Sequence, residues 1–157
     1  DSVTLTSSAS SVTFSSLDQS YGDLVLVTKT VSALNVTTGA IRFNSDSGNN
    51  YSIVNMRADG SSALSTANTF SSLRVNAYSS ASMATGQSST AKTQIFDYSA
   101  TDKHKSVLSR GDNAQSGTTA TAGRWANTAA ITSIEFLNST ANSYAAGSTF
   151  YLYGIEK

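Results

Sequence analysis

The single histidine is the first residue to test for chemistry. His104 lies between Lys103 and Lys105, in a polar stretch that is typical of a loop or a strand edge. A hydrolytic triad needs a histidine held beside a serine and an acid. A zinc site here would have to be completed by carboxylates, because the chain has no cysteine. His104 is therefore interpreted as a solvated surface residue, and no catalytic residue is predicted.

The acidic residues are scattered along the chain, so nothing marks the facing pair of carboxylates that a glycosidase requires. One loop has oxygen donors at alternate positions, as calcium loops do: Asn44, Asp46, Gly48 and Asn50. This loop has only one carboxylate and lacks the terminal glutamate, so an Asx-rich turn is the preferred interpretation. The sequence therefore predicts no metal, no cofactor and no enzymatic activity.

Trp125, the only tryptophan, follows Arg124 and lies two residues before Asn127. Exposed aromatic rings with polar neighbours can hold sugars, because the ring stacks on the apolar sugar face while the polar groups bond its hydroxyls. Trp125, Arg124 and Asn127 are therefore candidate glycan contacts. The alternative, which is preferred, places Trp125 in the core or at a sheet edge. The exposure of Trp125 discriminates between the two.

The charge balance argues against two classes of partner. Ten basic and ten acidic residues leave no net charge, so the chain lacks the positive field that nucleic-acid binding requires. No apolar run approaches the about 18 residues needed to cross a bilayer, so no membrane partner is predicted. Zero net charge fits a subunit of a larger assembly, although neutral drift would give the same balance.

Apolar and polar residues alternate along most of the chain, which predicts strands. The candidate strands are residues 23–31, 40–44, 51–57, 72–79, 93–99, 106–110, 131–137 and 148–157, with a further short strand at the N-terminus. A cluster of Asn, Asp, Ser and Gly at 44–50 predicts that the two strands around it form a β-hairpin. Residues 61–70 are a weak helical candidate, and low-complexity residues 79–93 and 114–122 are expected to be loops.

These elements predict one all-β domain over residues 1–157. About eight or nine strands at this spacing are typical of an antiparallel β-sandwich, and a jelly-roll-like topology is the first choice. Pairing of the first strand with the last would close one exposed sheet edge.

Three stretches in order carry a resemblance to a known group of proteins. They are AIRFNSDSGNNY at 40–51, GRWANTAAITSI at 123–134 and AGSTFYLYGI at 146–155. They resemble virion proteins of tailed bacteriophages, especially marine and cyanobacterial phages, in which an R-F-N-x-D-x-G-x-N-Y hairpin precedes I-T-S-I and A-G-S-x-F-x-L-Y-G-I. The resemblance spans nearly the whole chain from about Ser11 onward. It implies a β-sandwich on the virion surface, as a capsid decoration (cement) protein, a head fibre or a tail-fibre domain.

The resemblance carries over no catalytic residue, and the motif residues look structural. Phe43 and Tyr51 would anchor the two arms of the predicted hairpin. Arg42 could pair with a carboxylate such as Asp46 or Asp59.

Three functional hypotheses follow. The first is a virion structural protein that forms homo-oligomers or docks on other capsid or fibre proteins, by burying apolar surface and pairing strand edges. The second is a carbohydrate-binding module for host-surface recognition, with Trp125 as its best residue. The third and weakest is an enzyme such as a depolymerase, which two carboxylates facing across a cleft would support.

Overall fold

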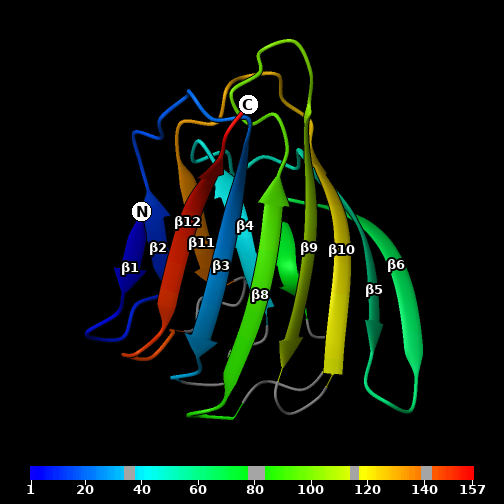
Figure 1. Ribbon diagram of the computed structural model, residues 1–157. Coiled ribbons are helices and arrows are strands. Elements are labelled where there is room, and N and C mark those ends of the chain that lie inside the picture. Colours follow the sequence, from blue (N-terminus) through cyan, green and yellow to red (C-terminus); the bar gives the residue numbers. More distant parts are fainter. Residues whose placement is uncertain (34–37, 78–83, 114–116, 139–142) are drawn as a thin grey trace.

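Every regular element in the described part of the chain is a β-strand (Figure 1). The structure is a computed structural model that describes residues 1–33, 38–77, 84–113, 117–138 and 143–157. The strands are β1 (Ser2–Thr4), β2 (Ser11–Phe14), β3 (Asp23–Val31), β4 (Thr38–Phe43), β5 (Tyr51–Ala58), β6 (Ala63–Phe70), β7 (Leu73–Ala77), β8 (Ser88–Ile95), β9 (Lys105–Asn113), β10 (Gly117–Trp125), β11 (Ile134–Asn138) and β12 (Thr149–Ile155). No helix within these ranges could span a membrane.

The strands form two antiparallel sheets, one of eight strands and one of four. The order in the large sheet is β1-β12-β3-β8-β9-β10-β5-β6, and the order in the small sheet is β2-β11-β4-β7. Figure 1 shows the large sheet in front and the small sheet behind it. The predicted antiparallel β-sandwich is confirmed, although the described residues form twelve strands instead of eight or nine.

Among the strands that the sequence did not predict, β6 and β10 lack a clear alternation of apolar and polar residues, whereas β2 alternates but has only four residues. Residues 61–70, the weak helical candidate, contain β6, whose side chains are exposed on both faces until Phe70. Residues 114–122, expected to be a loop, overlap β10, which alternates threonine with alanine and lacks large apolar residues until Trp125. The expected loop at 79–93 overlaps β8, which begins at Ser88, while residues 79–83 lie outside the described ranges.

The predicted hairpin around residues 44–50 is wrong. β4 pairs with β11 and β7 in the small sheet, whereas β5 pairs with β10 and β6 in the large one. The loop crosses from one sheet to the other, through positive φ angles of 50° at Asn44 and 58° at Ser45. Phe43 and Tyr51 still anchor its two ends, because their rings meet across the sandwich with centroids 6.1 Å apart. A local turn signal reports a change of direction and cannot reveal which sheet receives the next strand.

The two ends of the chain are neighbours in the large sheet (Figure 1). β1 pairs with β12, with Ser2 opposite Tyr151, and β1 is itself the outermost strand on this side of the large sheet. The N-terminal ammonium group of Asp1 also donates a hydrogen bond of 2.8 Å to the carbonyl oxygen of Leu152.

The hydrophobic core fills the space between the two sheets and contains two groups of aromatic rings. In one group, Trp125 lies 5.5 Å from Phe43 and 6.4 Å from Tyr51, between ring centroids. In the other, ring centroids lie 5.2–6.1 Å apart among Phe136, Tyr144 and Phe150. Such pairs contribute about 0.5–1.5 kcal/mol each beyond the apolar area that they bury.

Arg42 pairs with neither of the carboxylates proposed for it. Its Nη1 lies 3.1 Å from Oε2 of Glu135, its direct cross-strand partner on β11. Asp59 instead accepts hydrogen bonds from Ser61 and Ser62 in its own turn. The pairing between β4 and β11, which links distant parts of the sequence, decides this ion pair.

Candidate binding face

The structure places Trp125 in the core, where 1% of its surface is exposed. Its Nε1 donates a hydrogen bond of 2.7 Å to Oδ2 of Asp46, in the loop that crosses between the sheets. Because the ring is enclosed by Phe43 and Tyr51, it offers no free face for a sugar to stack on. A glycan site centred on Trp125 therefore lacks its platform.

The other two candidate glycan contacts do not join Trp125 in one site. Arg124 is exposed on the opposite side of β10, because neighbouring residues of a strand face opposite ways. Asn127 lies in the loop after β10, where its Oδ1 accepts a hydrogen bond of 2.9 Å from the backbone N–H of Ala129.

The carboxylate of Asp46 is surrounded by protein donors. Its Oδ1 accepts a hydrogen bond from the Gly48 backbone, and Asn50 Nδ2 donates to both oxygens. Partial burial raises the pKa of Asp46, but the hydrogen bonds from Trp125, Asn50 and Gly48 outweigh this effect and hold the pKa below its ordinary value. The loop is thus organised by internal hydrogen bonds.

His104 is exposed on the loop before β9. The neighbouring Lys105 is buried, and its Nζ donates to the carbonyl oxygens of Lys103 and Thr128 at 2.9 and 3.1 Å. Burial lowers the pKa of Lys105. Within the described ranges, no group of three or more His, Asp or Glu side chains is arranged to hold a metal ion.

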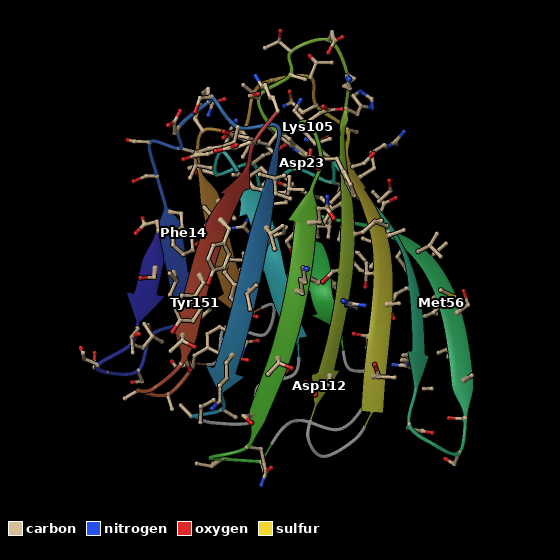
Figure 2. All side chains as sticks on the ribbon, viewed as in Figure 1. Phe14, Asp23, Met56, Lys105, Asp112 and Tyr151 are labelled. Atoms are coloured by element: carbon tan, nitrogen blue, oxygen red, sulfur yellow. The ribbon has the colours of Figure 1, made fainter. Side chains whose placement is uncertain are left out.

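The most exposed apolar surface lies on the outer face of the large sheet, the face turned away from the core. The large apolar side chains exposed here are Val54, Met56, Leu108, Tyr151, Tyr153 and Ile155. Of the exposed large apolar side chains in the described ranges, only Leu64 is absent from this set, because it is paired with Arg57 and points the other way. In Figure 2, Tyr151 lies toward the left margin of this sheet and Met56 toward its right margin. Exposed apolar side chains that lie close together can mark an interaction site.

Strand register aligns the outward side chains of this face in two rows that cross the sheet. The first row runs through Tyr151, Val27, Lys92, Arg110, Ala120 and Met56. The second runs through Tyr153, Val25, Gln94, Leu108, Ala122 and Val54. Each row therefore passes from an aromatic ring, through polar groups, to small and apolar side chains.

A trough follows β10, because its outward side chains are small and those of its neighbours are large. Ala120 and Ala122 form the floor, while Met56 on β5 and Leu108 on β9 stand on either side. The hollow has a volume of about 310 Å³ and extends to Lys92, Gln94 and Arg110. A second hollow of about 510 Å³ continues toward β6 and shares Val54 and Ala122 with the first.

Lys92 and Arg110 lie directly opposite each other on β8 and β9. Like charges at directly opposed positions destabilise a sheet. Neither forms an ion pair with a described carboxylate, since the two ion pairs found in these ranges are Arg42–Glu135 and Lys103–Asp97. The exposed cations of this pair therefore remain available to a ligand.

The carboxylates on the same face are already engaged. Asp23 accepts hydrogen bonds from the side chain of Gln94 and the backbone of Asp97, at 2.9 Å each. Asp112 accepts two from Thr90, through its backbone N–H and its hydroxyl. On this face the two carboxylates thus accept hydrogen bonds from the protein, whereas Lys92 and Arg110 form no ion pair with a described residue.

β6 forms one margin of the large sheet, and no strand of the described residues pairs with its outer side. Its eight residues, Ala63–Phe70, include no charged residue and no proline. All are exposed except Phe70, which is half-buried. Its unpaired backbone groups are therefore accessible to another strand.

Sequence reasoning missed most of this face. The alternation of residues 148–157 separates Tyr151 and Tyr153 from Phe150 and Leu152, so the aromatic end could have been found. The opposition of Lys92 and Arg110 depends on strand register, and no local pattern encodes it.

No protein-family model and no curated protein matches this chain. Among solved structures, it is similar to the galectin LEC-6 of Caenorhabditis elegans, with 7% identity over 97% of this chain and 95% of that chain and a TM-score of 0.43. It is also similar to a mutant of the alginate lyase Aly36B in complex with an alginate tetrasaccharide, with 9% identity over 88% of this chain, 72% of that chain and a TM-score of 0.30. These likenesses concern the arrangement of strands alone.

Proposed function

We propose that this chain is a non-enzymatic structural module of a bacteriophage virion surface, which self-associates and docks on other virion proteins by packing. The observation that carries the packing mechanism is the free edge of β6, together with the apolar outer face beside it. The three motif stretches that resemble tailed-phage virion proteins support the virion setting.

The β6 edge favours pairing with a second copy of the same strand. Natural proteins protect long sheet edges with charges, prolines or bulges, and β6 has no charge or proline. An antiparallel β6–β6 pair about a two-fold axis joins two large sheets into one and satisfies the edge of both copies. The opposite margin needs less protection, because β1 has only three residues.

Light scattering on the purified chain tests this pairing. The wild-type protein is expected to have twice the chain mass of 16.3 kDa. Lysines introduced by Ser65→Lys with Ala67→Lys would face their copies across the two-fold seam, so this variant is expected to be monomeric. The matched control, Ser106→Lys with Thr118→Lys, adds the same charge at exposed positions of the same face and keeps the dimer. A wild-type monomer at all concentrations would refute the pairing.

The virion setting has its own test. Particles of a phage that encodes the chain are purified on a density gradient and their peptides are identified by mass spectrometry. The proposal expects this chain at many copies per particle, and its absence from particles that contain the other structural proteins would refute the virion role.

Carbohydrate binding is the second candidate function, and the outer face favours it at a different place from Trp125. The rings of Tyr151 and Tyr153 are exposed and nearly parallel, with an interplanar angle of 20° and centroids 6.4 Å apart. The trough along β10 has the size of a small-ligand site, for which volumes of about 300 Å³ and more are typical. A glycan array compared with the Tyr151→Ala, Tyr153→Ala double variant tests this function, and an array without any bound glycan would eliminate it.

A further inference from the structure

We infer that the trough along β10 is a site for an acidic saccharide, in which Arg110 and Lys92 bind a sugar carboxylate and the alanine floor receives the apolar face of the ring. This inference rests on the second candidate function and specifies its ligand class. It does not involve the β6 edge.

The shape of the trough suits a flat ligand with an apolar side. Ala120 and Ala122 expose only methyl groups along the floor, and Met56 and Leu108 add apolar walls. The C–H face of a pyranose ring packs against such surfaces, as it does on aromatic platforms.

The charge of the trough selects an anion. Arg110 and Lys92 lie at one side of the hollow, directly opposite each other and without an ion-pair partner among the described residues. A carboxylate between them would relieve the repulsion of the two cations. The planar guanidinium of Arg110 matches a carboxylate with two parallel hydrogen bonds, while Lys92 contributes a compact charge.

The outer face as a whole, with Lys92 and Arg110 included, has more cations than carboxylates. Its outward strand positions carry the cations Lys29, Lys92, Arg110 and Arg124 and the carboxylates Asp23 and Asp112. Both carboxylates already accept hydrogen bonds from the protein. An acidic polymer therefore meets a favourable field along its approach, even though the chain as a whole has no net charge.

Titration calorimetry of the full chain with a tetramer of galacturonic acid tests the inference. Its methyl ester is the matched ligand, because it keeps the sugar rings and removes the charge. We expect the acid to bind at least about tenfold more tightly than the ester, since the ester lacks the negative charge that strengthens hydrogen bonds from Arg110 and Lys92. Dextran sulfate, a polyanion without carboxylates, is expected to bind more weakly than the acid tetramer.

Variants identify the site. Arg110→Gln and Lys92→Gln are each expected to weaken binding of the acid about tenfold or more, and Ala120→Leu to abolish it by filling the floor. Lys29→Gln removes the same charge from the same face outside the hollow and is expected to leave the affinity within about twofold.

Each contrary outcome has a distinct meaning. Equal binding of acid and ester would overturn the carboxylate assignment and leave carbohydrate binding in place. Equal effects of Lys29→Gln and Arg110→Gln, or stronger binding of dextran sulfate, would overturn the site and indicate attraction of polyanions in general. If neither saccharide nor any glycan of the array binds, the second candidate function fails together with this inference.

Discussion

The hydrogen bond from Trp125 Nε1 to Asp46 Oδ2 ties the crossing loop to the core. A double-mutant cycle with Trp125→Phe and Asp46→Ala measures its contribution to the free energy of unfolding. Trp125→Phe removes the donor and part of the ring packing, and we expect a loss of about 2–3 kcal/mol. Asp46→Ala leaves a buried indole N–H without its acceptor and also removes the acceptor of Gly48 and Asn50, for a similar loss of about 2–3 kcal/mol.

The coupling between the two substitutions isolates the bond. Hydrogen bonds to charged groups contribute about 1.5–3 kcal/mol, and the partial exposure of Asp46 places this one near the lower limit, at about 1–2 kcal/mol. For a chain of this length each kcal/mol corresponds to about 2–4 °C in Tm. Urea unfolding followed by circular dichroism gives the four free energies. Additive losses, with a coupling below about 0.3 kcal/mol, would refute the bond's role in stability.

The remaining predictions concern pH, packing and accessibility. The hydrogen bonds of Asp46 hold its folded-state pKa below the ordinary value of 3.8. The ionised Asp46 carboxylate therefore stabilises the folded state fully above pH 3.8, and this stabilisation is lost as the pH falls through the lower folded-state pKa. Thermal unfolding of Asp46→Asn should therefore lose part of the acid dependence of the wild-type protein below about pH 5, and parallel curves would contradict this assignment. Gly154→Ala would place a methyl group 2.3 Å from Cγ of Tyr21, so urea unfolding should show a loss of about 1–3 kcal/mol, whereas an unchanged midpoint would mean that the ring is not held there. Trp125 fluorescence should resist acrylamide quenching, and quenching comparable to that of the free amino acid would contradict its burial.

The strands that sequence predicts well are those with one face in the core and one in solvent. β12 is the clearest case, since Phe150 and Leu152 are buried while Tyr151 and Tyr153 are exposed. The alternation of Phe150 and Leu152 with two tyrosines makes this strand visible from its own residues alone. β3 is predicted for a different reason, because a continuous run of β-branched and aliphatic residues favours a buried strand.

β10, which the sequence does not predict, obtains its burial from distant segments. Thr119 and Thr121 of β10 are buried because the small sheet covers them, although their composition resembles that of a loop. The crossing of the chain from β4 in one sheet to β5 in the other could not be predicted from local sequence either, because β4 pairs with β11 and β5 pairs with β10, both far away in sequence. The same limit applies to the trough, whose opposed pair Lys92 and Arg110 exists only through the register of β8 and β9.

Hydrogen exchange at the β6 amides tests the proposed packing mechanism most directly. The backbone N–H groups of β6 that do not bond to β5 point to the free edge of the sheet, where an isolated chain leaves them to solvent. Self-pairing predicts that these amides are protected in the wild-type protein and lose protection in the Ser65→Lys, Ala67→Lys variant, while the amides of β9 and β10 are unchanged. Exchange at the rate of an open loop in the concentrated wild-type protein would contradict the mechanism.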